Sequence, residues 1–250
     1  MTAGQDLKTK MFKIKLADLI IEIDNKYSFI ENQCREYVID ADYADIKASC
    51  TDAEIEAEHE NYNPKSDFSL GYCESICIYR HICLQMPYFD AFIVHSAVVA
   101  VNGKAYAFAA RSGTGKSTHL LLWKEYLKEK MQVINGDKPI VRFINGTLYA
   151  YGTPWCGKEG WQTNARAELK AICFLERDTQ NRIEPLDKTK AADLIMKQIL
   201  MPKDPLGAIK TLELLDQMLK KTDTWLLGCN ISIDAAKLSY NTMAGENNEN

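Results

Sequence analysis

The sequence predicts an α/β protein with a mixed sheet, flanking helices and a small N-terminal α+β subdomain. From about residue 91 onward, short runs rich in Val, Ile and Ala alternate with helical patterns. Asn-Gly pairs at residues 102–103 and 145–146 each separate two strand-like runs, and Asn-Gly is a strong signal for a tight hairpin. Because hairpins outnumber simple crossovers, a mixed sheet fits better than a regular parallel sheet.

The chain is long enough for one good-sized domain and a smaller one. It has 250 residues, of which 46% are hydrophobic, so it can bury a substantial core. We expect an N-terminal α+β region at residues 1–90, a core domain at residues 91–235 and a disordered tail at residues 236–250. The last seven residues, AGENNEN, are polar and offer little apolar surface to bury.

The N-terminal region mixes strand-like runs with helical patterns. FKIKL, LIIEI and EYVID have the composition of short strands, and the acidic residues 51–64 predict a loop or a solvated helix. Apolar residues recur at intervals of three and four over residues 66–86, which predicts a helix that ends at Pro87. Cys73 and Cys83 lie about 15 Å apart along this helix, so they cannot share one metal ion with Cys77 and His81.

The core domain has a regular succession of predicted elements, each bounded by turn residues. We expect strands at residues 92–101, 105–110, 132–135, 140–144, 147–152, 169–177 and 224–230, and helices at residues 118–130, 188–200 and 206–220.

Composition excludes several classes of partner. The net charge is -4 and the Lys and Arg residues are scattered, which argues against nucleic acid and anionic membrane surfaces. The N-terminus lacks the pattern of a secretory signal, and the longest apolar run, residues 91–101, is too short to span a bilayer. The eight cysteines are therefore expected as reduced thiols in a cytoplasmic protein.

A phosphate-binding loop is predicted between the strand at residues 105–110 and the next helix. Residues 110–117, ARSGTGKS, match the pattern of Gly, four residues, Gly-Lys and Ser or Thr, with alanine in the first position. Glycines let backbone N–H groups turn toward phosphate, and the helix N-terminus adds positive potential. The expected nucleotide-binding residues are Ser112, Gly113, Thr114, Gly115, Lys116, Ser117 and Thr118. Such a loop serves kinases, ATPase motors, GTPase switches and passive sensors alike.

A carboxylate follows the next predicted strand. Asp137 lies 21 residues after Lys116, where the chain leaves the strand at residues 132–135. Ligands bind at this edge of open α/β sheets, so Asp137 is a candidate catalytic base or metal ligand. Asn-Gly-Asp is also turn chemistry, and a turn role stays open. Only two apolar residues precede Asn135 and Gly136, which argues against the Walker-B aspartate of a motor or switch.

Two segments, HSAVVAVNGKAYAFAARSGTGKST and VINGDKPIV, resemble the catalytic domain of HPr kinase/phosphorylase. They also resemble shorter HPr-kinase-like proteins, which are akin to phosphoenolpyruvate carboxykinase. The similarity covers about residues 92–230, and its anchors are His95, the loop RSGTGKST and Asp137. It implies that residues 91–235 form a P-loop kinase core with a mixed sheet, which uses ATP and Mg²⁺.

The resemblance also implies roles for individual residues. Lys116 binds phosphate, Ser117 and Asp137 bind Mg²⁺, and Asp137, with His95 nearby, activates the hydroxyl that receives the γ-phosphoryl group. The implied acceptor is a serine of a peptide or protein, and the implied assembly is a homo-oligomer. Gly136 stands where HPr kinase has the first of two adjacent aspartates. A kinase of small hydroxyl metabolites and a nucleotide-binding regulator without transfer activity therefore stay open.

Five further residues each have two interpretations. Lys158 either stabilises the transferred phosphoryl group or lies exposed in its loop. Trp155 and Trp161 either line an acceptor pocket or fill a core. His119 lies beside the nucleotide or within a helix turn, and Arg111 contacts phosphate or solvent.

Overall fold

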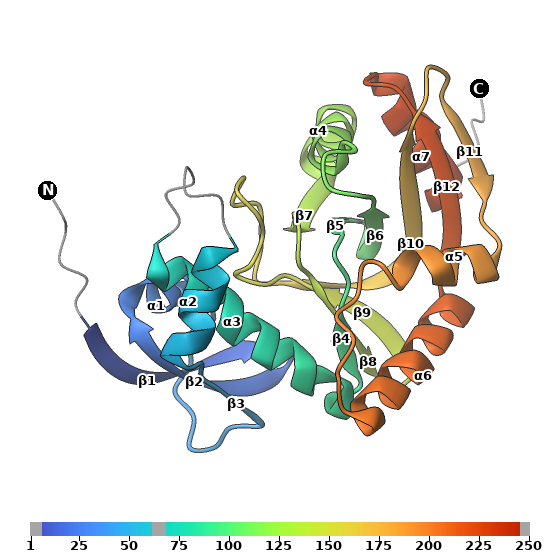
Figure 1. Ribbon diagram of the computed structural model, residues 1–250. Helices are drawn as coiled ribbons and strands as arrows, with labels where there is room; N and C mark the ends of the chain where they lie inside the picture. The colour runs from blue at the N-terminus through green and yellow to red at the C-terminus, as the bar shows by residue number, and fades with distance from the viewer. Residues whose placement is uncertain (1–6, 62–68, 246–250) are drawn as a thin grey trace, which may run out of the picture. The chain divides into compact units, whose positions relative to one another are not determined.

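The computed structural model describes residues 7–61 and 69–245, and the chain divides into two compact units (Figure 1). The first unit comprises Met1–Tyr88 and the second Phe89–Asn250. The described strands form a three-stranded sheet in the first unit and a nine-stranded sheet in the second. Across the described ranges, no helix combines the length and the hydropathy that crossing a bilayer requires.

The first unit is a small α+β arrangement. Strands β1 (Leu7–Leu16) and β2 (Leu19–Tyr27) form an antiparallel hairpin, and β3 (Ile46–Ala48) pairs in parallel with β2. The helices are α1 (Ser28–Gln33), α2 (Asp52–Glu60) and α3 (Leu70–Gln85). Glu74 on α3 is fully buried and accepts hydrogen bonds from the backbone N–H groups of Lys26 and Tyr27 at 2.6 and 3.0 Å, which fixes α3 to the end of β2.

Most expectations for the first unit are confirmed, with one correction. FKIKL and LIIEI lie within β1 and β2. EYVID is not a strand, because Arg35–Tyr37 form a 3-10 turn and Val38 makes only an isolated bridge with Ile14. The acidic stretch is a helix over Asp52–Glu60, begun by a capping box at Thr51, and residues 62–68 lie outside the described part.

The cysteines are free thiols, as predicted. All eight are unbridged and seven are buried. Cys73, Cys77 and Cys83 lie on α3, where they pack as small apolar groups. Burial raises the pKa of the Cys34 and Cys50 thiols to about 12, so both stay protonated at neutral pH.

The second unit holds the mixed sheet. Its strands are β4 (Ala91–Ile93), β5 (Ala97–Val101), β6 (Lys104–Ala109), β7 (Met131–Asn135), β8 (Ile140–Ile144), β9 (Thr147–Tyr151), β10 (Arg166–Arg177), β11 (Arg182–Pro185) and β12 (Asp223–Cys229). The order is β4-β8-β9-β10-β6-β5-β7, with β12 beside β10 and β11 beside β12. The pairs β6–β10 and β10–β12 are parallel and the others antiparallel, which confirms the predicted mixed α/β sheet.

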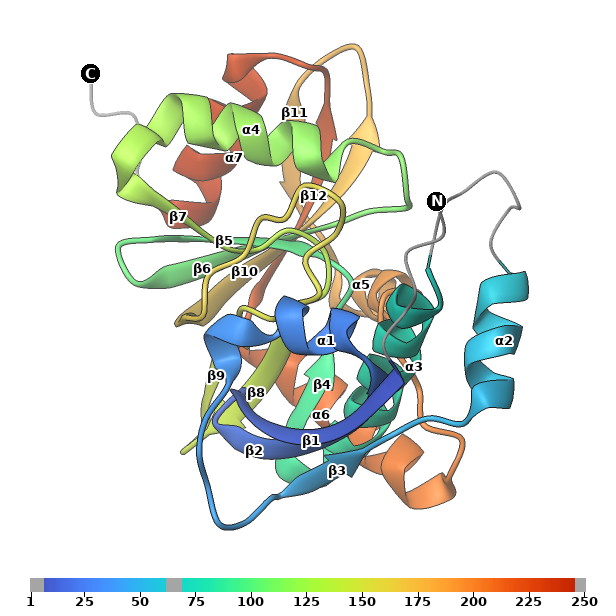
Figure 2. The same cartoon turned by 90° about the vertical axis from the view of Figure 1, so that its left-hand side faces the viewer.

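Helices cover both faces of this sheet. They are α4 (Lys116–Leu127), α5 (Lys188–Ile195), α6 (Pro205–Lys221) and α7 (Ile233–Ala244). Side chains alternate along a strand, so β5 directs Val98 and Ala100 into a core with α5 and α6. Its other residues, Ala97, Val99 and Val101, enter a second core with α4 and α7. Figure 2 shows α4 and α7 on one side of β5, β6 and β10, and α5 and α6 on the other.

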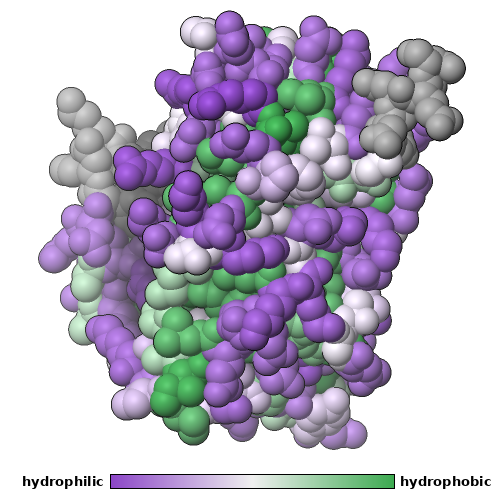
Figure 3. Space-filling view, turned by 90° about the vertical axis from the view of Figure 1, so that its right-hand side faces the viewer, coloured by the Kyte–Doolittle hydropathy of each residue, from purple (hydrophilic) through white to green (hydrophobic). Residues whose placement is uncertain are grey.

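Helix α6 buries only part of its apolar surface. Leu215 and Leu219 are buried, whereas Leu206, Ile209 and Leu212 are 56%, 53% and 48% exposed. Figure 3 shows hydrophobic surface interrupted by hydrophilic side chains on this side of the molecule.

The predicted boundaries need four corrections. The strand expected at residues 92–101 is two strands, β4 and β5, separated by residues 94–96. Helix α4 begins two residues earlier than expected, at Lys116, and ends at Leu127. Helix α5 ends at Ile195, and β11 was not expected.

A further correction concerns the C-terminus, where disorder was expected over residues 236–250. Residues up to Ala244 form α7 instead, and residues 246–250 lie outside the described part. Ser232 caps the start of α7, and Gly245 follows its end with a φ of 72°. Ala236 and Tyr240 of α7 are buried against the sheet, so packing stabilises the helix.

A buried polar cluster joins α4 to α7. Trp123 Nε1 donates a hydrogen bond to Ser239 Oγ at 2.8 Å, and His119 Nε2 lies 3.0 Å from the same oxygen. The His119 ring also packs edge-on against Phe108. His119 therefore lies in the core between two helices, as its helix-turn interpretation predicted. Burial lowers the pKa of His119 to about 4.

We expect this histidine to make folding stability depend on pH between about 6.5 and 4. The unfolded chain protonates His119 near its ordinary pKa of 6.5, whereas the folded chain protonates it near 4. The free energy of unfolding then falls by up to about 3 kcal/mol as pH drops through this window, and no further below it.

Urea unfolding at several pH values checks this expectation. His119→Gln should show a flatter dependence than the parent, and His59→Gln, at an exposed position on α2, serves as the control. Equal pH dependence in His119→Gln and the parent would contradict it.

Candidate active site

The predicted strand–loop–helix context of the phosphate loop is present. Residues 110–115 connect β6 to α4. Gly113 and Gly115 have φ values of +77° and +125°, and a Cβ at either position would meet no atom within 4 Å. The glycines are therefore required by the backbone conformation rather than by crowding.

The N-terminus of α4 offers free backbone donors. No side chain caps this end of the helix, and its hydrogen-bond ladder starts with His119 N donating to Gly115 O at 2.8 Å. The first-turn residues, Lys116, Ser117 and Thr118, lie before this bond. Their N–H groups have no partner within the helix, and the helix dipole adds positive potential here, so the end suits an anion.

Lys116 folds back over the loop. Its Nζ donates a hydrogen bond to Ala110 O at 3.2 Å. Burial lowers the pKa of Lys116, and the negative charge of Asp137 partly opposes this effect. Lys116 and Asp137 thus interact electrostatically across the site.

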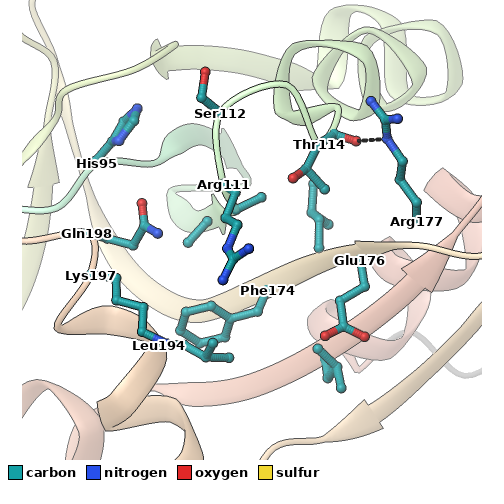
Figure 4. A pocket seen from close by; sticks show the side chains of 14 residues that line it. His95, Arg111, Ser112, Thr114, Phe174, Glu176, Arg177, Leu194, Lys197 and Gln198 are labelled. Atoms are coloured by element: carbon teal, nitrogen blue, oxygen red, sulfur yellow. Dashed lines mark hydrogen bonds between the residues drawn. The ribbon is translucent and has the colours of Figure 1, made fainter.

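Arg177, a residue that sequence reasoning missed, holds the loop from outside. It is the last residue of β10, the strand beside β6. Its guanidinium donates hydrogen bonds to the carbonyl of Gly113 and, through Nε at 3.3 Å, to the carbonyl of Thr114 (Figure 4). These bonds fix the orientation of two peptide groups in the loop. A cationic residue at the end of a predicted strand was the available signal.

The interruption between β4 and β5 positions His95. The backbone N–H of His95 donates to Gln198 O at 2.7 Å, and Ser96 N donates to Asp137 O at 3.0 Å. The ring then meets the predicted carboxylate, with His95 Nε2 2.8 Å from Asp137 Oδ1. Two candidate residues that lie 42 positions apart in the chain are therefore in direct contact.

Asn135, not Asp137, performs the turn role of the Asn-Gly-Asp sequence. Its Oδ1 accepts hydrogen bonds from the N–H groups of Asp137 and Lys138 at 2.8 and 2.7 Å. Its Nδ2 donates to the carbonyl of Thr153 at 3.0 Å, and the residue is fully buried. Because Asn135 supplies the turn contacts, the carboxylate of Asp137 is available to His95.

The Asp137 carboxylate is held in its charged form. Burial alone would raise its pKa, but the hydrogen bond and charge of His95 and the charges of Lys138 and Lys116 outweigh burial. The net effect lowers the pKa of Asp137 below its ordinary value. The group is therefore an anion at neutral pH that can accept a proton or bind a cation.

The residues present fit a magnesium ion. Ser117 and Asp137 could supply oxygen ligands, which Mg²⁺ prefers, and water molecules could complete its coordination, because this ion usually keeps several of them. Within residues 7–61 and 69–245, no group of three or more His, Cys, Asp or Glu side chains forms a metal site.

A cavity of about 570 Å³ opens beside the loop (Figure 4). It lies between the start of the loop, the end of β10 and the segment that follows α5. Its walls include His95, Ala110, Arg111, Ser112, Thr114, Phe174, Leu175, Glu176, Arg177, Leu194, Lys197, Gln198 and Leu226. Sequence reasoning missed most of this wall, because its residues come from segments far apart in the chain.

The remaining candidate residues differ in whether they line this cavity. Arg111 lines the cavity, whereas Lys158, Trp155 and Trp161 do not. Lys158 is exposed, Trp155 is buried, and Trp161 packs against the core beneath α4 and α7. The structural interpretations of Lys158 and both tryptophans are therefore favoured.

The chain leaves little room for a side chain at position 136. A Cβ on Gly136 would lie 3.0 Å from Cys156 O and 3.4 Å from Trp161 O. A Cβ on Gly157 would lie 3.2 Å from that of Asp137. Residues 156–161 therefore pack closely over the turn that carries Asp137, which favours glycine at position 136.

Comparisons with known proteins do not show the family. No family model matches the chain, and no curated protein matches it. Among solved structures, the HPr(Ser) kinase/phosphatase from Coxiella burnetii is similar over 51% of this chain and 97% of its own length. The identity is 15% and the TM-score is 0.26, which is too low to support an argument about fold or activity.

We expect Gly136→Asp to destabilise the protein. The new Cβ would press on two backbone carbonyls, and such overpacking costs about 1–3 kcal/mol. Thermal unfolding of Gly136→Ala and Gly136→Asp checks this, because alanine adds the Cβ alone. A stability equal to the parent in both variants would contradict the close packing.

Proposed function

We propose that this protein is an ATP- and Mg²⁺-dependent phosphotransferase that acts on a hydroxyl group, with a serine of a peptide or protein as acceptor. One observation carries the proposal. Asp137, hydrogen-bonded to His95 at 2.8 Å, interacts electrostatically with Lys116 of the loop. A group suited to activating an acceptor therefore adjoins a loop suited to binding phosphate.

The loop would bind the triphosphate. N–H groups of Gly113, Gly115 and the first turn of α4 would contact phosphate oxygens, and Lys116 would exchange its bond with Ala110 O for the β- and γ-phosphates. Arg177 would preserve the loop conformation through its two carbonyl contacts. The bound Mg²⁺, held by Ser117 and Asp137, would neutralise charge on the phosphates.

The hydrogen-bonded pair of Asp137 and His95, called the dyad below, would activate the acceptor. Asp137 would take the hydroxyl proton as that oxygen bonds to the γ-phosphorus and the bond to the β-phosphate oxygen breaks, releasing ADP. His95 would donate to Oδ1 and orient the carboxylate. Most of the acceleration would come from placement and from charge stabilisation, as is usual for phosphoryl transfer.

A second candidate is a nucleotide-binding regulator without transfer activity. The glycine at position 136 favours it, because the close contacts with Cys156 O and Trp161 O leave the site with one carboxylate where HPr kinase has two. A kinase of small hydroxyl metabolites is a third outcome of the same experiment.

Labelled ATP, tested with serine peptides and small alcohols, checks the proposal. We expect Lys116→Ala to abolish transfer and Asp137→Asn to slow it by about 10²–10⁴-fold, the usual range for a lost general base. Calorimetry should show that Asp137→Asn still binds nucleotide. Transfer by Asp137→Asn at the parent rate would refute the base assignment, and tight binding without any product would favour the regulator.

The pH dependence of kcat/KM should report the contact with His95. Asp137 works as an anion, so activity falls as pH drops through its pKa, which His95 lowers. We expect His95→Ala to move this acidic limb to higher pH. His95→Gln retains a donor without the charge and should move it less. His81→Gln, in the first unit, is the control, and an unmoved limb in His95→Ala would contradict the assignment.

A further inference from the structure

We propose that the cavity beside the loop is the acceptor site and that it selects hydroxyl-bearing peptides with acidic side chains near the hydroxyl. This inference rests on the proposed function and adds the chemistry of its substrate. It follows from the position of the cavity, from the charges on its wall and from its apolar floor.

The cavity adjoins both halves of the proposed machinery. His95, which contacts Asp137, lines it at one end. Ala110, Arg111 and Ser112, the first residues of the loop, line it from another side (Figure 4). A hydroxyl held at the His95 end of this cavity would therefore lie near the side chain that contacts Asp137.

Besides Arg177, two cationic side chains line the cavity. Arg111 comes from the loop and Lys197 from the segment after α5, and both side chains are exposed. Neither forms an ion pair with a carboxylate in the described part of the chain, so both charges are available to a ligand. Glu176, the acidic residue of the wall, lies at the opposite end from His95 in Figure 4, and Arg177 is engaged with the loop.

Backbone contacts attach the segment that carries Lys197 to the segment that carries His95. The next residue, Gln198, accepts the hydrogen bond from His95 N at 2.7 Å. Ile199 then forms an antiparallel bridge with Val94. Lys197 is thus attached to the same short segment that positions His95.

The floor of the cavity is apolar. Phe174, Leu194 and Leu226 contribute it from β10, α5 and β12. An apolar floor beside two unpaired cations is complementary to a peptide that presents an apolar side chain and a carboxylate next to its hydroxyl residue. A basic peptide would meet like charge instead.

A charge reversal with a matched control tests this inference. Two serine peptides should be compared that differ only in whether the flanking residues are acidic or basic. The parent should favour the acidic peptide in kcat/KM. Lys197→Glu should reduce that preference by up to about fivefold, the effect of one exposed ion pair. Lys190→Glu, an exposed position on α5 outside the cavity, should leave it unchanged.

The outcomes separate this inference from the proposed function. An equal rate with both peptides in the parent would overturn the inference. So would a Lys197→Glu variant with raised KM for ATP and unchanged peptide preference, because the cavity would then hold the nucleoside. Absence of product with every acceptor would count against the proposed function alone. Anisotropy of a labelled acidic peptide would still decide the inference, since Lys197→Glu should then weaken binding and Lys190→Glu should not.

Discussion

The hydrogen bond between His95 and Asp137 is the contact on which the whole site depends. It requires His95 to leave the regular strand, and the backbone bond from His95 N to Gln198 O supports that departure. It also requires that the Asp137 carboxylate is not used to stabilise the turn. Asn135 makes the turn hydrogen bonds instead, through its side-chain oxygen. Two strand ends and the segment after α5 thus converge at one point, and the loop adds Lys116 to it.

Local signals predicted the elements that depend on local chemistry. The turn between β6 and α4 follows from two glycines between an apolar strand and a helix. Both hairpins follow from Asn-Gly, where residues 102–103 and 145–146 have positive φ values. Helix α7 shows the opposite case. Its polar sequence near the C-terminus suggested disorder, but burial of Ala236 and Tyr240 in the core overrides that preference.

Long-range contacts determined what the sequence alone did not predict. The interruption at residues 94–96, Val-His-Ser, lies between two apolar runs that together resemble one continuous strand. Its partners are 41 to 105 positions away, so the local pattern did not reveal it. The cavity has the same origin, because Arg111, Phe174 and Lys197 are brought together only by the order of strands in the sheet.

The hydrogen bond and the ring contact between α4 and α7 have a practical consequence for C-terminal truncation of this protein. A fragment that stops at residue 235, a natural choice from composition, would lack Ser239 and Tyr240. The indole of Trp123 would lose its acceptor, and the ring of Tyr240 would no longer cover it. Since α4 starts at the loop of residues 110–115, shortening the carboxyl end would also disturb that loop, and loss of activity in such a fragment would not identify a catalytic residue.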